Sequence, residues 1–167
     1  VRDSLLGRLG NDLDFTTDAR PDDTKKILKK WATDVWDVGI KFGTIGAKKE
    51  DVTYEITTYR ADSYVSDSRK PEVNFGSSIT EDLLRRDFTV NAMAIELTTP
   101  TPEFIDPHNG VTDLLKKTIR TPSSPELSFS DDPLRMLRAA RFAAQLGFTI
   151  DESVISAMKD MADRLSI

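Results

Sequence analysis

Two aspartates near the N-terminus, Asp12 and Asp14, have the residue type and the spacing to bind a divalent cation. They alternate with Leu13 and Phe15 in the stretch NDLDFTT, and this period of two predicts a half-buried strand. Residues two apart on a strand project from one face, with Cα atoms ~6.5–7 Å apart. Such carboxylates can share one or two Mg²⁺ ions, and two metal ions held in this way can activate an attacking hydroxyl and stabilise a leaving pyrophosphate. A solvated strand edge would show the same pattern.

Arginines offer a second chemistry, the binding of phosphate. The stretch DDPLRMLRAARFAAQLG predicts a helix from about residue 131 that ends at Gly147. At about 100° per residue, Arg135, Arg138 and Arg141 span roughly 120° of this helix, with Asp132 roughly 60° beyond Arg135. Guanidinium groups in fork geometry suit a triphosphate, although ion pairing with acidic neighbours would explain the same residues. Other arginines in apolar or small-residue contexts are Arg2 and the pair Arg85 and Arg86.

The rest of the pattern predicts the elements that position these groups. Pro21 and the two aspartates after it predict a helix to about Trp31. Ser78 and Glu81 have the spacing of a capping box. The stretch 61–77, rich in Ser, Asp and Lys, predicts a mobile irregular segment. We also expect strands at TDVWDVG, KFGTIGA and VTYEITTYR, a linker at TPSSPELS and a last helix over about 152–164.

Composition limits the possible classes of protein. The chain has 167 residues, of which 38% are hydrophobic and 31% charged, so disordered and collagen-like classes are excluded. It has no cysteine and a single histidine, His108, which excludes thiolate and His-rich metal sites. The net charge of −5 is unlike that of a stand-alone nucleic-acid binder. No apolar run approaches ~18 residues, so we expect no membrane span. The net charge and the lack of cysteine favour a cytoplasmic protein.

At this point three ordered motifs carry a family resemblance. VRDSLLGRLGNDLDFTT resembles the opening motif of class II template-independent nucleotidyltransferases, the CCA-adding enzymes and bacterial poly(A) polymerases. EDLLRRDFTVNAMA resembles their second motif, and DDPLRMLRAARFAAQLGF the motif of their neck. The resemblance implies an α+β fold, in which a polymerase-beta-like nucleotidyltransferase head with a small mixed sheet is followed by all-α neck helices. We expect the catalytic head at 1–120 and the truncated start of the neck at 121–167.

The resemblance also implies roles for individual residues. Asp12 and Asp14 correspond to the family's catalytic Mg²⁺ ligands. Asp132 and Arg135 correspond to the pair that reads the incoming base in place of a nucleic-acid template. The other nucleotide contacts that the resemblance implies are Arg2, Arg86, Arg138 and Arg141.

Further positions follow the family less closely. Asp87 and Asn91 lie in the motif near the sugar and phosphates, and strand alternation makes Glu55 a candidate third acidic group. The sequence starts at Val1, without the Gly-Gly that precedes this valine in the family, so we expect the natural start to lie upstream. Asp131 stands where the family often has Glu, and we expect little effect from this change.

The implied reaction is attack of an RNA 3′-hydroxyl on the α-phosphate of CTP or ATP, with release of pyrophosphate. The stretch VGIKFGTIGA lacks the arginine-rich GRRF-type run of the bacterial poly(A) polymerases, which favours CCA addition to tRNA. Poly(A) addition, addition of C or A alone, and a non-catalytic nucleotide-binding module are the alternatives. The sequence carries no signal for an oligomeric state.

Overall fold

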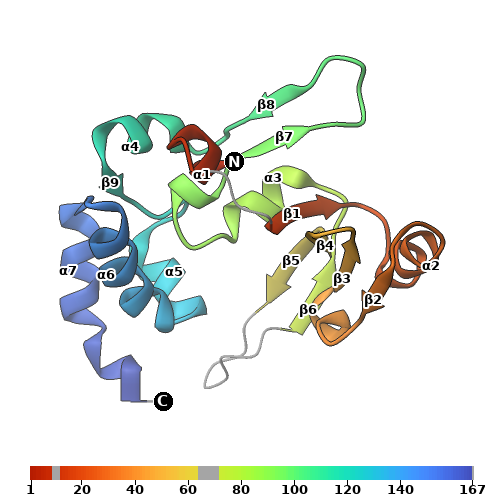
Figure 1. The fold of residues 1–167 in the computed structure, drawn as a ribbon. Coiled ribbons are helices and arrows are strands. Elements are labelled where there is room, and N and C mark those ends of the chain that lie inside the picture. The colour runs from red at the N-terminus through yellow and green to blue at the C-terminus, as the bar shows by residue number, and fades with distance from the viewer. Residues whose placement is uncertain (9–11, 64–71, 167) are drawn as a thin grey trace. The chain divides into compact units, whose positions relative to one another are not determined.

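The computed structural model describes residues 1–8, 12–63 and 72–166 (Figure 1). These residues form two compact units, which we name by their content. The sheet unit comprises residues 7–8, 12–63 and 72–82, and the helical unit comprises residues 1–6 and 83–166. The boundary at residue 120 between head and neck remains a prediction.

The sheet unit is built on a mixed four-stranded sheet in the order β1-β4-β3-β2 (Figure 1). The first pair is parallel and the other two are antiparallel. The predicted strands and the predicted helix at Pro21 are confirmed, except that the start of the expected strand KFGTIGA belongs to a 3₁₀ helix. Their bounds are β1 Asp12–Thr17, α2 Pro21–Trp31, β2 Asp34–Trp36, β3 Thr44–Lys49 and β4 Val52–Thr58, with a short 3₁₀ helix at Ile40–Phe42.

Helix α2 covers one face of this sheet. Leu28 of α2 packs with Ile45 and Ala47 of β3, and Tyr54 and Ile56 of β4 pack against the same cluster. Because neighbouring residues of a strand alternate between faces, Glu55 lies on the face opposite α2. Asp14 is the register partner of Glu55, so it lies on that face as well. We call this side of the sheet the carboxylate face.

The expectation of an irregular segment at 61–77 is wrong at both ends of that stretch. Residues Arg60–Ser63 form β5 and pair antiparallel with β6, Glu72–Phe75. The short strands carry few apolar residues, and backbone hydrogen bonds hold them together without a periodic pattern in the sequence. The part of the predicted mobile segment at 64–71 lies outside the described residues. The predicted cap is confirmed: the amide of Glu81 donates to Ser78 Oγ (3.3 Å) at the start of α3, Ile79–Leu84.

The helical unit has its own core, in which Phe88, Phe129, Met136 and Val154 are almost completely buried. The helices around it are α4 Gly110–Lys116, α5 Pro125–Asp131, α6 Leu134–Leu146 and α7 Glu152–Asp160, with α1 Arg2–Leu5 at the N-terminus and 3₁₀ helices at Thr89–Asn91 and Ala162–Ser166. Its strands are the hairpin of β7 Ala94–Glu96 with β8 Glu103–Ile105, and the parallel pair of β9 Thr118–Ile119 with β10 Thr149–Ile150.

Two sequence expectations fail in this unit. The expected linker TPSSPELS contains the start of α5, because Ser124 caps the helix through Leu127 N (3.2 Å) and Pro125 occupies its first position. The helix expected from about residue 131 begins at Leu134, since Asp132 has extended backbone and ends α5. Gly147 ends α6 in the left-handed conformation, as predicted. Among the residues that the structure describes, no helix is long and apolar enough to cross a membrane.

Candidate active site

The carboxylate face presents acidic side chains on neighbouring strands. Asp14 of β1 and Glu55 of β4 are exposed and lie opposite each other in the parallel register. Asp12 is the first residue of β1, opposite Thr53 in the same register, and its side chain lies outside the described part of the structure. The register supports the expectation that Glu55 belongs with the aspartates, which strand alternation alone had suggested.

The chemistry of these side chains fits a hard divalent cation. Within the described residues, neither Asp14 nor Glu55 forms an ion pair, so two negative groups on adjacent strands have no cationic partner. Carboxylate oxygens are the ligands that Mg²⁺ prefers. No group of three or more acidic or histidine side chains that could hold a metal is found among the described residues. A cation at this face would therefore also need Asp12, water or a phosphate oxygen as a ligand.

A cluster of guanidinium groups surrounds Phe142 in the helical unit. Arg2, Arg138 and Arg141 lie 5.1, 5.4 and 4.9 Å from the centre of its ring. We call these three residues the arginine cluster. No signal in the sequence indicated a role for Phe142, because an apolar residue next to Arg141 is typical of a hydrophobic core. The ring provides a common surface on which the like-charged groups lie close together, an arrangement suited to a multiply charged anion.

Hydrogen bonds fix two members of the arginine cluster. Asp87 accepts from Arg138 Nε (2.8 Å) and Nη2 (2.5 Å) through one oxygen, and from Asn91 Nδ2 (2.9 Å) through the other. Asn91 Oδ1 in turn accepts from Arg2 Nη1 (2.6 Å). Asp87 and Asn91 therefore act as a bridge between two arginines. Arg141 is exposed and makes no ion pair with any described residue.

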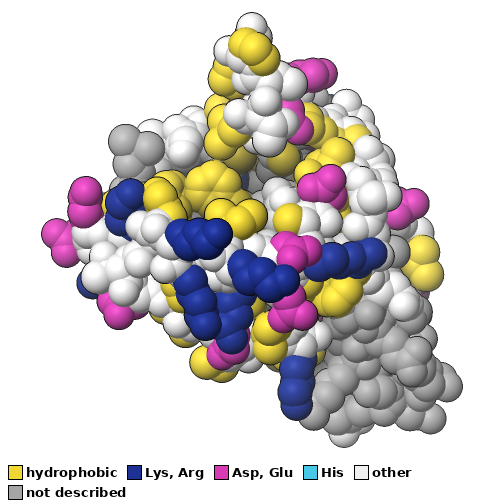
Figure 2. Space-filling view, turned by 90° about the vertical axis from the view of Figure 1, so that its right-hand side faces the viewer, with side chains coloured by type: hydrophobic (Ala, Val, Ile, Leu, Met, Phe, Trp, Pro, Cys, Tyr) yellow, Lys and Arg dark blue, Asp and Glu magenta, His cyan; other side chains and the backbone are white. Residues whose placement is uncertain are grey.

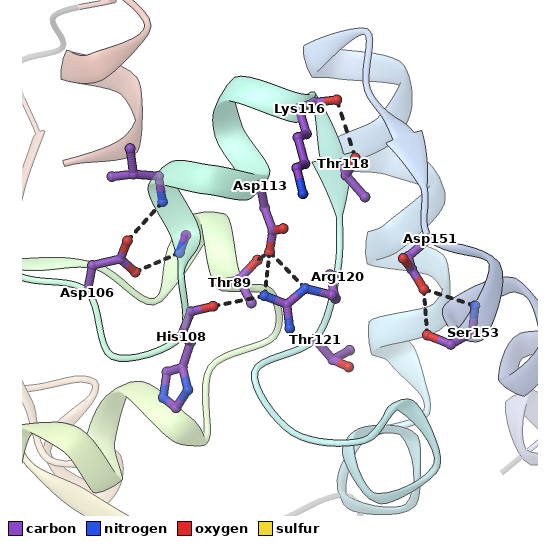
Figure 3. A network of polar contacts seen from close by, with 12 residues as sticks. Thr89, Asp106, His108, Asp113, Lys116, Thr118, Arg120, Thr121, Asp151 and Ser153 are labelled. Carbon is purple, nitrogen blue, oxygen red and sulfur yellow. Dashed lines mark hydrogen bonds and ion pairs between the residues drawn. The ribbon is translucent and has the colours of Figure 1, made fainter.

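A second polar network holds the 3₁₀ helix that carries Asn91 (Figure 3). Asp113 accepts from Thr89 Oγ1 (2.5 Å) and from Arg120 Nε (3.0 Å), and Arg120 Nη2 also donates to the carbonyl of His108 (2.9 Å). The amide of Thr89 donates to the carbonyl of Arg120 (2.8 Å). Thr89 and Asp113 are buried. Sequence reasoning missed this network because its members are far apart in the chain.

Asp132 and Arg135 do not share a helix. Asp132 precedes α6 and accepts from the amide of Leu134 (3.0 Å), whereas Arg135 lies inside α6 and is only 6% exposed. The guanidinium of Arg135 donates to Ser128 Oγ (2.9 Å) and to the carbonyl of Arg85 (2.7 Å). The prediction that Asp132 and Arg135 lie on one helix is therefore wrong. Arg86, the remaining predicted contact, is half-buried in the same unit.

Basic side chains also gather on the face that carries α2, but acidic side chains lie among them (Figure 2). Lys26 pairs with Asp23 (3.1 Å), and Lys25 pairs with Asp37. Because opposite charges are interspersed, this surface lacks the concentrated positive charge of the arginine cluster. The arginine cluster is therefore the better candidate for binding phosphate.

The family model described as the poly A polymerase head domain matches residues 1–120. The chain belongs to the poly A polymerase head domain family. The match contains Asp12, Asp14 and the second motif with Asp87 and Asn91, and it ends before α5. The resemblance seen in the sequence motifs is thereby confirmed.

Individual relatives of this head-domain chain are named as CCA-adding enzymes. It is 44% identical over 161 residues to the CCA-adding enzyme of Enterococcus faecalis, and the aligned part covers 96% of this chain and 38% of that protein. It is also 44% identical over 171 residues to the CCA-adding enzyme of Bacillus subtilis, with 100% and 41% covered. The chain thus spans about two fifths of the length of these curated relatives.

Solved structures of related proteins have the same fold as this head-domain chain. The CCA-adding enzyme of Bacillus stearothermophilus in complex with CTP is 38% identical, with a TM-score of 0.78 over 94% of this chain and 36% of that one. A tRNA nucleotidyltransferase in complex with a primer tRNA and an incoming ATP analog is 34% identical, with a TM-score of 0.77 over 97% and 44%. The expected α+β fold with a small mixed sheet is confirmed.

Proposed function

We propose that this chain is the catalytic part of a CCA-adding enzyme, which transfers CMP and AMP from CTP and ATP to the 3′ end of tRNA and releases pyrophosphate. The observation that carries the proposal is the exposed acidic pair of Asp14 and Glu55 on adjacent strands. It occurs in a family whose named relatives add CCA. The absence of cysteine suits work in the reducing cytoplasm.

In this proposal Asp12 and Asp14 are the catalytic carboxylates that hold Mg²⁺, and Glu55 supports them. Bound Mg²⁺ supplies Lewis-acid chemistry, which lowers the pKa of an attacking hydroxyl and offsets the charge of a triphosphate. The exposure of Asp14 and Glu55 supports this role because a solvated, unpaired carboxylate is available as an oxygen ligand.

The arginine cluster supplies the donors for the triphosphate. Arg141 has no described ion pair, and Arg138 shares its charge with Asp87, so both leave guanidinium donors for phosphate oxygens. Arg2 is held through Asn91, and Arg86 is the further contact that the family motif implies. These residues bind and orient the nucleotide, and their positive charge stabilises the pyrophosphate as it leaves.

Base selection is assigned to Asp132 and Arg135. On their Watson–Crick edges, cytosine and adenine both present a ring nitrogen that accepts a hydrogen bond beside an exocyclic amine that donates one, whereas uracil and guanine do not. Asp132 can accept from the amine and Arg135 can donate to the ring nitrogen. For Arg135 this requires a donor beyond those given to Ser128 and Arg85, and the five N–H groups of a guanidinium allow it.

The experiment that tests this function is product analysis. The full-length protein is incubated with tRNA that lacks its 3′ end, together with CTP, ATP and Mg²⁺, and the RNA products are sequenced. We expect ends that read CCA. Long A tails would instead identify a poly(A) polymerase, addition of a single kind of nucleotide would identify a partial enzyme, and no addition would favour a nucleotide-binding module.

A further inference from the structure

The carboxylate face carries an aromatic side chain that the proposed reaction has not used. Trp36 belongs to β2, the edge strand of the sheet. Its neighbour Val35 packs with the core beneath α2, so Trp36 lies on the opposite face, the one with Asp14 and Glu55. Trp36 is the register partner of Gly46, Gly46 of Glu55, and Glu55 of Asp14. These residues form one row across the sheet.

The indole of Trp36 lies directly on the backbone of Gly46. A Cβ added to Gly46 would come within 2.0 Å of Trp36 Nε1 and 2.1 Å of Cε2. Only glycine at this position lets the ring fold inward over the sheet. The backbone of Gly46 does not itself need glycine, because it adopts ordinary β-strand geometry and has no positive φ. The missing side chain at residue 46 therefore serves the placement of Trp36.

This placement brings an aromatic surface toward the carboxylates. Gly46 is two strands away from Asp14, which corresponds to about 10 Å at the usual spacing of ~4.8 Å per strand. Trp36 keeps 37% of its surface exposed although one part of the ring rests on Gly46. A tryptophan ring that is supported on one side and open to solvent is the usual form of a platform for nucleobase stacking.

We propose that Trp36, resting on Gly46, is a stacking platform for the terminal base of the RNA acceptor strand. The inference rests on the proposed function, in which the 3′-hydroxyl of that strand reacts at the carboxylates. The base of that nucleotide must then lie within one nucleotide's length of Asp14. The indole of Trp36 lies within a similar distance of Asp14. The incoming CTP or ATP is the weaker candidate, because its base and phosphates are already assigned to Asp132, Arg135 and the arginine cluster.

Stacking on a ring face is tolerant of sequence, because every base has a π-face. This property matches the task of a CCA-adding enzyme, whose acceptor ends in the base that precedes CCA before the first addition and in cytosine before the next two. Trp36 therefore contributes affinity for the acceptor end without selecting one base, whereas selection of the incoming base is left to other residues. Trp36 is a binding residue, and it makes no contact with a metal in this scheme.

Trp31 provides a matched control. It is 42% exposed, close to the value for Trp36, but it stands against Tyr54 and Lys49 on the α2 side of the sheet. These are the only tryptophans in the chain. The variants Trp31→Phe and Trp36→Phe each remove the tryptophan fluorescence from one side of the sheet, and the difference between them isolates the signal of Trp36.

The binding experiment titrates the Trp31→Phe and Trp36→Phe variants of the full-length protein with an RNA minihelix ending in CC, without nucleoside triphosphate. We expect quenching of Trp36 in the Trp31→Phe protein and little change in the Trp36→Phe protein. An otherwise identical minihelix with an abasic 3′ terminus should lose this quenching. Quenching by CTP but not by RNA, equal quenching by the abasic RNA, or none at all would overturn the proposal.

A kinetic experiment separates the platform from a structural role. Trp36→Ala should raise KM for RNA about tenfold, as expected for the loss of one base–aromatic stack. KM for CTP should stay unchanged, Trp36→Phe should restore most of the affinity, and Trp31→Ala should have no effect. Gly46→Ala should reproduce the Trp36→Ala effect, because it displaces the ring. Circular dichroism confirms the folding of each variant.

The two proposals fail in different ways. If the protein adds CCA but Trp36→Ala leaves KM for RNA unchanged, the platform is wrong and the proposed function stands. If the RNA end quenches Trp36 but no nucleotide is added, the platform stands as an RNA-binding site and the proposed function is wrong.

Discussion

Asp87 is the residue that fixes Arg138 in the arginine cluster. The Asp87 side chain is 9% exposed and accepts from both Nε and Nη2 of Arg138, which is 42% exposed. Through its other oxygen it holds Asn91, which holds Arg2. The carboxylate thus aims two guanidinium groups without taking up all of their donors.

We expect Asp87→Asn to weaken both nucleotide binding and the fold. Loss of the charge weakens the hydrogen bonds that hold Arg138. Because residue 87 is buried, its new amide group lacks a full set of hydrogen-bond partners, at a cost of ~1–3 kcal/mol in the free energy of unfolding. KM for CTP should rise severalfold, whereas KM for RNA should change little. Urea unfolding and steady-state kinetics measure these effects. Asp160→Asn, at an exposed site on α7, is the control, and an equal loss in both variants would contradict the role of Asp87.

Arg141→Ala should separate binding from stability. Arg141 is exposed and pairs with no acidic side chain in the described residues, and its contact with the Phe142 ring is worth at most ~1 kcal/mol. Its removal should therefore change the free energy of unfolding by less than ~1 kcal/mol. The loss of a charge-assisted bond to phosphate should raise KM for CTP and ATP about tenfold or more. Lys159→Ala on α7 removes an exposed positive charge elsewhere. If both variants raise KM equally, general electrostatics explains the effect.

Arg135→Ala tests the assignment of base selection. We expect the preference for CTP and ATP over UTP and GTP to fall about tenfold or more, since losing one partner of an edge-reading pair costs ~1–3 kcal/mol. The dependence on Mg²⁺ should change little. The measurement is kcat/KM for all four nucleotides across a magnesium titration. An equal fall for all four would show that Arg135 serves only to join Ser128 and the carbonyl of Arg85.

The sequence predicted α2 and the strands of the four-stranded sheet well, but it missed β5 and β6 in the same unit and the connections of the helical unit. Strands β1 and β4 carry a period of two, and the start of α2 carries local helix signals. These local features agree with the packing of α2 against one face of the sheet, which stabilises the same elements. The start of α5 was mistaken for a linker because Ser and Pro are typical of both loops and helix N-termini.

The site was only partly accessible to sequence reasoning. Alternation could place Asp14 on a face, but the parallel register that sets Glu55 beside it depends on how β1 and β4 pair. The helical wheel for the stretch from residue 131 failed because Asp132 lies before the helix. Arg2, Asn91, Asp87 and α6 come from segments about fifty to ninety residues apart in the chain. No local sequence pattern could predict that they meet.

His108 should make stability depend on pH. Burial lowers the pKa of His108 below its ordinary value, the nearby carboxylate of Asp106 acts in the opposite direction, and the guanidinium of Arg120 adds to the lowering. The unfolded chain therefore binds the proton more readily than the folded chain. Stability should be complete above about pH 6.5 and fall as the pH is lowered below that value.

Urea unfolding of the chain between about pH 5 and 7.5 measures this dependence. His108 is the only histidine, so His108→Asn should flatten the curve in this range. A wild-type protein that becomes more stable on acidification, or a variant with an unchanged curve, would contradict the pKa direction.

The most direct test of the central claim is nucleotide addition by Asp14→Ala and Asp12→Ala variants of the full-length protein, on tRNA lacking its 3′ end. Asp14 is exposed, so its removal should leave the free energy of unfolding within ~0.5 kcal/mol of the wild type. Asp51→Ala, in the exposed turn between β3 and β4, removes a carboxylate outside the carboxylate pair. We predict that addition is abolished in both test variants and unchanged in Asp51→Ala. Near-wild-type turnover of either test variant with Mg²⁺ would contradict the assignment of these aspartates as the catalytic carboxylates.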